Sequence, residues 1–155
     1  MIDTMTVLAY LLGDDSGHNK QIKLNAEFSQ TQVVEISPKV IWKNVPPEAD
    51  SLVLIVKDSD IPKKENYYWV VYNIPADSHG VDLDESKIIN KNNVGLNSWG
   101  QKNYHALDYP KKNHKIYITV YALDKKFSSI QNITGESLEQ KIRGHVLAKG
   151  EVIKS

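Results

Sequence analysis

The chain has no cysteine among its 155 residues and carries no formal net charge. The absence of cysteine excludes disulfide bonds, thiolate catalysis and cysteine-ligated zinc sites. Because 19 basic residues balance 19 acidic ones, the composition gives no electrostatic support for nucleic acid as a partner. No polybasic cluster lies beside an amphipathic helix, which argues against adsorption to a membrane surface.

Long hydrophobic runs are also missing. The apolar run over residues 5–12 is far shorter than the about 18 residues that a membrane span needs. It has neither the basic start nor the small-residue cleavage site of a signal peptide. We therefore expect a soluble, cytoplasmic protein that forms a single domain over residues 1–155, long enough to bury roughly 70% of its unfolded surface.

Short segments rich in β-branched and aromatic residues make up most of the chain. They predict strands over residues 5–12, 21–29, 37–42, 51–58, 67–75, 114–124 and 145–154. One helix is predicted over residues 135–143, because Thr134 can cap it, Leu138 and Ile142 share a face, and Gly144 can end it. Residues 76–101 read as a long polar surface loop. The pattern predicts a mostly β fold, an antiparallel β-sandwich or barrel with one short C-terminal helix.

Two strand-end residues stand out as candidates for a site. Asp58 is in phase with the apolar Leu52, Leu54 and Val56, and His114 is in phase with the apolar residues that follow it. If these two strand ends meet at one rim of the sandwich, the carboxylate can orient the imidazole and form a small polar pocket. In the alternative interpretation, Asp58 caps a turn through its own backbone and His114 is an ordinary rim residue.

The remaining histidines and motifs indicate no catalysis. His105 lies in an irregular aromatic loop, and His145 follows the predicted helix, where its ring could bond the free carbonyls. No two histidines have the spacing of a metal site, and no nucleophile elbow, phosphate loop or dinucleotide fingerprint occurs. We therefore expect no metal and no cofactor.

Six segments, taken in order, resemble the phosphatidylethanolamine-binding protein family, also called Raf kinase inhibitor proteins, and specifically its bacterial branch. They are ISPKVIWKNVP (36–46), SLVLIVKDSDIP (51–62), WVVYNIPAD (69–77), GLNSWG (95–100), HKIYITVYALD (114–124) and GHVLAKGEV (144–152). The resemblance implies a β-sandwich with a small anion-binding pocket at one end. It implies that Asp58, Asp60 and Pro62 frame this pocket together with His114, and that its ligands are phosphate-like or carboxylate groups, including phospholipid headgroups.

The sequence departs from the family pattern around that pocket. Tyr68 stands where a second pocket histidine is usual, Ala106 replaces a glycine, and Tyr109-Pro110 replaces a Pro-Pro pair. Asp108 falls where backbone amides would cradle the anion. Fewer donors and one more carboxylate, which costs on the order of 1 kcal/mol, predict a weakened or re-targeted pocket. Tyr104 and Tyr109 would favour a small, partly apolar ligand if they lean over its mouth.

The resemblance favours a non-enzymatic binding protein whose ligand site comprises Asp58, Asp60, Pro62, Tyr68, Ala106, Asp108, Pro110 and His114. In the family, the protein partners are kinases or peptidases. Several bacterial relatives look dimeric, so the resemblance also implies a homodimer for this chain. Two alternatives remain open. One is an interaction domain with a degenerate pocket. The other is a small-ester or phosphate hydrolase that uses Asp58, Asp60 and His114, with the histidine oriented by an aspartate as general base.

Overall fold

Nearly all of the regular structure is β-strand. The computed structural model describes residues 20–27, 38–58, 66–81, 88–90, 92–106, 115–128 and 130–154. The elements are β1 (Lys20–Gln21), β2 (Lys23–Glu27), β3 (Lys39–Lys43), β4 (Ser51–Asp58), β5 (Asn66–Pro75), β6 (Gly80–Val81), β7 (Ile116–Leu123), α1 (Gly135–Ile142) and β8 (Val146–Lys154).

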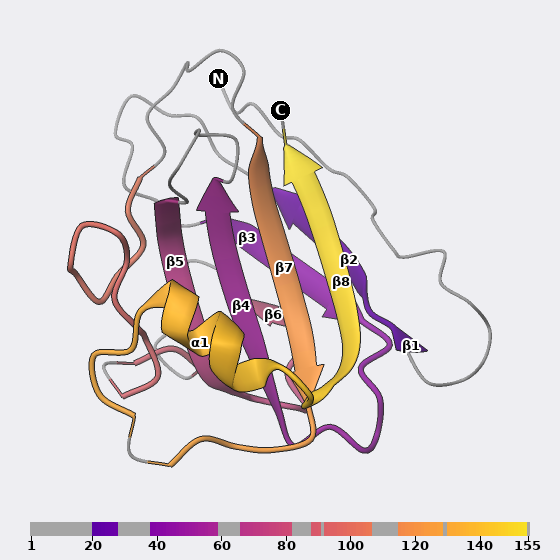
Figure 1. Ribbon diagram of the computed structural model, residues 1–155. Helices are drawn as coiled ribbons and strands as arrows, with labels where there is room; N and C mark the ends of the chain where they lie inside the picture. The colour runs from indigo at the N-terminus through magenta and orange to yellow at the C-terminus, as the bar shows by residue number, and fades with distance from the viewer. Residues whose placement is uncertain are drawn as a thin grey trace.

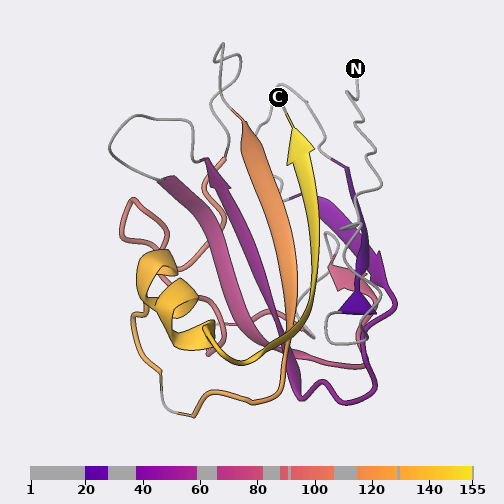
Figure 2. The same cartoon turned by 45° about the vertical axis from the view of Figure 1, so that its right-hand side comes forward.

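The strands form two sheets that face each other. The large sheet has the order β1-β8-β7-β4-β5, and the small sheet has the order β2-β3-β6. Figure 2 shows the small sheet on one side of the large sheet and α1 on the other. Among the described pairings between named strands, all are antiparallel except that of β1 with β8, which is parallel. The predicted mostly antiparallel β-sandwich with one short C-terminal helix is therefore confirmed.

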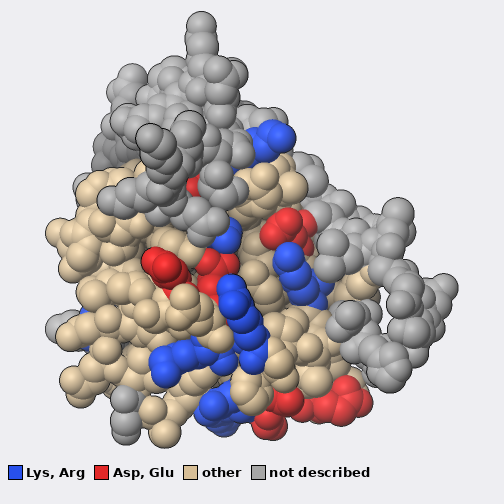
Figure 3. Space-filling view, in the orientation of Figure 1, with Lys and Arg blue, Asp and Glu red and all other residues tan. Residues whose placement is uncertain are grey.

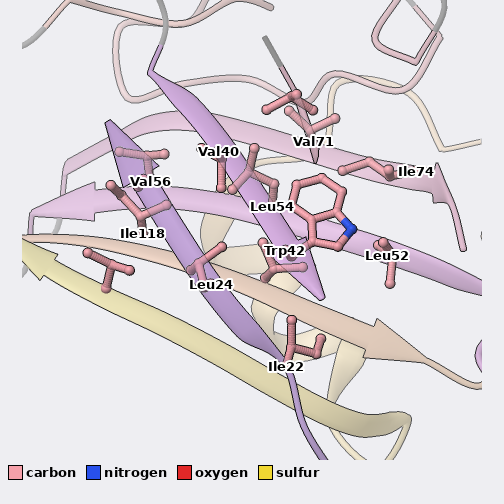
Figure 4. Packing of buried hydrophobic residues seen from close by; sticks show 14 of the residues in the cluster. Ile22, Leu24, Val40, Trp42, Leu52, Leu54, Val56, Val71, Ile74 and Ile118 are labelled. Atoms are coloured by element: carbon pink, nitrogen blue, oxygen red, sulfur yellow. The ribbon is translucent and has the colours of Figure 1, made fainter. Parts of the chain in front are cut away.

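The main core lies between the two sheets. Alternate residues of β2 and β3, including Leu24, Val40 and Trp42, point toward the inward residues of β4, such as Leu54 (Figure 4). Trp42 is fully buried, and its indole N–H donates to the carbonyl of Ser78 at 2.8 Å. This bond satisfies the one polar atom that the indole brings into the core.

A second, smaller core lies between the large sheet and α1. Val53 and Ile55 of β4 face this side and pack in one cluster with Leu138 and Ile142 of the helix. The expected cap is present, because the Thr134 side chain accepts a hydrogen bond from the backbone N–H of Ser137. The helix is therefore held on the sheet by the two apolar residues whose spacing predicted it.

Two expectations about polar residues differ from the structure. Part of the 76–101 segment is not on the surface: Asn93, Val94 and Asn97 are buried, and Val94 forms a β-bridge with Val71 on the edge of β5.

The His145 ring bonds the Asp124 carboxylate at 2.8 Å, and the backbone N–H of His145 is the group that reaches a helix carbonyl. A carboxylate is a stronger acceptor for an imidazole than a carbonyl.

Most strand predictions match the observed elements within a few residues. The short strand β6 was not predicted, whereas the final strand β8 matches the predicted range 145–154 within one residue. The strand predicted over residues 5–12 lies outside the described residues. Within the described part of the chain, no helix has the length and apolarity needed to cross a membrane.

Gly135 allows α1 to lie close to the sheet. A methyl group at this position would overlap the ring of Tyr67, which lies directly beneath the helix. We predict that Gly135→Ala lowers the free energy of unfolding by about 1–3 kcal/mol, because overpacking outweighs the better helix propensity of alanine. Urea denaturation measures this change, and Ser137→Ala, at an exposed position of the same helix, is the control. An unchanged midpoint for Gly135→Ala would show that the ring moves away at no cost.

The buried hydroxyl group of Tyr72 should make the stability of the fold depend on pH in the alkaline range. Its hydroxyl lies 3.0 Å from the Asn92 carbonyl and 3.1 Å from the Ile130 carbonyl, and burial raises the pKa of Tyr72 above 10.0. The folded chain thus keeps this proton to higher pH than the unfolded chain. The stability that this proton contributes is complete below the ordinary pKa of tyrosine. It is lost as the pH rises through the pKa of Tyr72 in the folded chain. We expect Tyr72→Phe to make the alkaline loss of stability shallower in urea titrations, and parallel pH profiles would contradict this assignment.

Candidate functional site

Four strand ends meet at one edge of the large sheet. Asp58, the last residue of β4, is in register with Asn66 at the start of β5 and with Ile116 at the start of β7. Ile116 is in register with Lys154 at the end of β8. We call these four residues the end row. Figure 1 shows the ends of β4 and β8 and the starts of β5 and β7 together at the upper edge of the sheet.

Asp58 is fully buried on the inner face of the sheet. It continues the inward phase of Leu52, Leu54 and Val56, all of which belong to the main core. The sequence pattern predicted this orientation, and the register confirms that the end of β4 lies beside the start of β7. A carboxyl group in such a place is a potential acceptor for a ligand or for a neighbouring imidazole.

Tyr68 and Trp69 both face the same side as Asp58 because β5 contains an irregularity. The register between β4 and β5 shifts between Val56 and Lys57, which leaves one extra residue in β5. As a result Tyr67 joins the cluster under α1, whereas Tyr68 joins the main core. Tyr68 is only 5% exposed, so its ring forms part of the wall at this end of the sandwich.

The loop over residues 97–106 is organised by one buried asparagine. The side-chain oxygen of Asn97 accepts from the backbone N–H groups of Trp99 at 2.9 Å and Gln101 at 3.1 Å. Its amide nitrogen donates to the carbonyl of Asn103 at 2.9 Å. Because these bonds tie both sides of the turn to a single side chain, the loop presents its aromatic residues from a fixed backbone.

Aromatic rings from this loop cover Tyr68. The imidazole of His105 stacks on the indole of Trp99, with ring centres 3.5 Å apart and planes 9° apart. Both rings lie near the Tyr68 ring, at 6.2 Å and 5.3 Å, and the backbone N–H of His105 donates to the Tyr68 carbonyl at 2.8 Å. We call Tyr68, Trp99 and His105 the aromatic corner. Trp99 is 45% exposed, so the corner is open to solvent on one side.

The predicted site residues are only partly within the described chain. Asp58 and Tyr68 lie at the same edge of adjacent strands, and Ala106 is half-buried directly after His105. Asp60, Pro62, Asp108, Pro110 and His114 lie outside the described residues, as does Tyr109. Tyr104 packs edge-on against Trp69, with ring centres 5.6 Å apart.

Sequence reasoning missed two residues at this edge. His105 was placed only in an irregular loop, and the signal that could have found it is its position next to Tyr104 in a segment that matches the family's pocket loop. Lys154 was not predicted as a residue of this edge, although it is in phase with the inward Ala148 and Val152 of β8. Among the residues described, no group of three or more histidine, aspartate or glutamate side chains could hold a metal ion.

A groove of about 920 Å³ lies on the opposite face of the large sheet, beside α1. At its floor the Glu139 carboxylate accepts from Lys57 at 2.8 Å and from the Tyr67 hydroxyl. Both oxygens of Glu139 are therefore engaged by the protein itself, which is typical of a structural polar network. Figure 3 shows lysine and arginine side chains gathered over the lower half of this face, with acidic side chains above and below them.

The comparisons with known proteins agree with this architecture. A model of the family "Phosphatidylethanolamine-binding protein" matches residues 14–154. A UPF0098 protein of Methanothermobacter thermautotrophicus is 34% identical over 121 residues, which cover 76% of this chain and 80% of that protein. A UPF0098 protein of Chlamydia trachomatis is 34% identical over 128 residues, which cover 79% of this chain and 83% of that protein.

Two solved structures share the fold. A crystal structure described as a phosphatidylethanolamine-binding protein homologue from Chlamydia trachomatis has a TM-score of 0.66 and 34% identity, and the match covers 76% of this chain and 78% of that one. E. coli YbcL has a TM-score of 0.68 and 21% identity, with 98% and 95% covered. The family model matches most of the length of the chain, and these relatives agree with it. The chain therefore belongs to the phosphatidylethanolamine-binding protein family.

Proposed function

We propose that this protein is a non-enzymatic binding protein that holds a small anion at the end row, such as phosphate, a carboxylate or a phospholipid headgroup. The observation that carries the proposal is the buried Asp58, which ends β4 in register with the first residues of β5 and β7. Strand ends that converge on a buried polar side chain are a common place for a ligand site. The aromatic corner closes the same edge of the sheet.

An anion requires several hydrogen-bond donors that point at one place. In the described part of the site, the Tyr68 hydroxyl and the His105 imidazole are the candidate donors, and Asp58 is an acceptor. The family resemblance adds His114, which we propose Asp58 orients toward the anion. The same resemblance adds Asp60, Pro62, Ala106, Asp108 and Pro110 as the surrounding wall.

The family membership and the composition of the corner favour binding over catalysis. A hydrolase would need a nucleophile beside the imidazole and donors for the developing oxyanion. The described part of this edge instead consists of the packed rings of the aromatic corner and the buried carboxyl group of Asp58. We therefore propose a binding or regulatory role, with a kinase or a peptidase as the class of protein partner.

The site is tested by ¹H–¹⁵N NMR titration with phosphate, acetate and phosphoethanolamine. We expect saturable shifts of the amides near Asp58, Tyr68 and His105 and none in the groove beside α1. His114→Asn should weaken phosphate binding by about tenfold or more, because a charge-assisted hydrogen bond contributes about 1.5–3 kcal/mol. The control is His79→Gln, since His79 is exposed and follows the opposite end of β5. If the wild-type amides near Asp58, Tyr68 and His105 do not shift at the highest ligand concentrations, the proposal is contradicted.

A second candidate function is protein recognition through the aromatic corner itself. Trp99 is 45% exposed, yet its loop is held by the hydrogen bonds of Asn97, and its ring is stacked on His105. An ordered aromatic side chain with an exposed face is typical of a contact that anchors a partner. Tyr68 is also buried beneath these rings, which favours a corner filled by the protein's own side chains.

The two functions differ in their response to Trp99→Ala. If the corner anchors a protein, this change should abolish partner capture, while the phosphate-induced shifts of the amides near Asp58 remain. If the corner serves the anion alone, partner capture should be unaffected. Fluorescence can follow the exposed indole selectively by acrylamide quenching, because Trp42 and Trp69 are buried.

A further inference from the structure

The groove beside α1 lies between the helix and the outer face of the large sheet. The flank of α1 forms one side, and the half-buried Tyr121 of β7 and Val146 of β8 line the sheet side. The segment 96–100 lines the groove near the start of the helix, where Leu96 forms a β-bridge with Thr134, the N-cap of α1. The groove therefore follows α1 from its first turn to its last.

Part of the outer face of the large sheet has no helix over it. In Figure 1, α1 crosses in front of β5 and β4, whereas most of β7 and β8 has no described helix in front of it. Ile153 of β8 belongs to this outer face, is in register with Tyr117 of β7 and is 41% exposed. The sheet therefore has room for a second helix beside α1.

The charges in the groove have a definite polarity. Its lining contains four charged residues, of which Lys57 and Glu139 bind each other at 2.8 Å. The other two, Glu136 and Arg143, are exposed, and neither forms an ion pair with another described residue. They lie at the two ends of α1, roughly 10 Å apart along the helix axis. The groove is thus anionic near the start of α1 and cationic near its end.

An antiparallel helix has the charge pattern that complements this groove. Helices are stabilised by acidic residues in the first turn and basic residues in the last, because of the helix macrodipole. α1 follows this rule, with Glu136 in its first turn and Arg143 at its C-cap. A second helix that follows the same rule, laid antiparallel beside α1, places its acidic end next to Arg143 and its basic end next to Glu136. A parallel helix would place like charges together.

The α1 helix of a second copy cannot occupy the groove in this way. Two α1 helices that lie antiparallel at the same height above the sheet must be related by a two-fold axis perpendicular to the sheet. That axis puts both sheets into one layer, where the second sheet would overlap the floor of the groove. A two-fold axis along the helices avoids the overlap but makes the helices parallel. The charge pattern therefore fits a helix from a different protein.

We propose that the groove beside α1 binds an amphipathic helix of a partner protein, antiparallel to α1. The partner helix has an acidic first turn next to Arg143, a basic last turn next to Glu136 and an apolar stripe against Tyr121 and Val146. An amphipathic helix in a groove is a recurring mode of protein recognition. This surface lies on the opposite face of the sheet from Asp58, so the inference goes beyond the proposed anion site and does not depend on it.

The probe is a stapled peptide of about 15 residues, which is long enough to be helical. It carries glutamates in its first turn, a leucine stripe along one face and lysines in its last turn, with a nitroxide spin label on its first residue. In ¹H–¹⁵N NMR spectra of the wild-type protein, we expect saturable shifts of the Tyr121 and Val146 amides. The label should broaden the amides that follow Arg143 and leave those near Glu136 sharp. Broadening at the Glu136 end, or shifts that avoid the groove, would overturn the proposal.

Charge reversal tests the contact at the cationic end. Arg143→Glu should weaken peptide binding by at least about fivefold, because an ion pair becomes a like-charge contact. Lys141→Glu is the matched control: it makes the same change of charge at an exposed position of the same helix that does not line the groove, and it should change the affinity by less than about twofold. Fluorescence anisotropy measures both affinities. Equal affinities of the two variants would overturn the role of Arg143.

Two further measurements complete the test. The position of the spin label is read on the wild-type chain, so it decides the orientation of the helix even if a variant does not fold. Sedimentation equilibrium of the wild-type chain alone shows whether the groove is taken by a second copy. Self-association that Arg143→Glu abolishes would assign the groove to that copy and overturn the partner helix, whereas a monomer, or a dimer that Arg143→Glu leaves intact, agrees with the proposal.

Discussion

The burial of β4 on both of its faces is the constraint on which the rest of the structure depends. Six consecutive residues from Ser51 to Val56 are buried, since one face of the strand packs against the small sheet and the other against α1. A strand that is apolar on both faces must lie at the centre of a three-layer arrangement. Pairing with β5 on one side and β7 on the other then fixes where both neighbours begin.

The same strand decides where polar chemistry can occur. At Lys57 and Asp58 the apolar run ends, and the two side chains point to opposite faces. Lys57 joins the Glu139 network beside α1, and Asp58 becomes part of the end row. The end of one strand thus supplies a structural ion pair on the outer face and a candidate ligand group on the inner face.

The extra residue in β5 decides which of two adjacent tyrosines faces the helix and which faces the main core. Tyr67 supports α1 and leaves room only for the hydrogen of Gly135, whereas Tyr68 supports the loop that carries Trp99 and His105. Without the shift in register, strict alternation would place Tyr68 and Trp69 on opposite faces. Helix packing and the aromatic corner are therefore coupled through one irregularity in the backbone.

Sequence by itself determined the elements whose cause is local. The strand limits follow from apolar runs that end at turn residues, α1 follows from Thr134 and the Leu138–Ile142 spacing, and the inward phase of Asp58 follows from alternation. Only the tertiary structure decided which strand ends meet, because register depends on pairing between residues far apart in the chain. For this reason His105 beside Tyr68, and Lys154 in a row with Asp58, could not be read from local pattern.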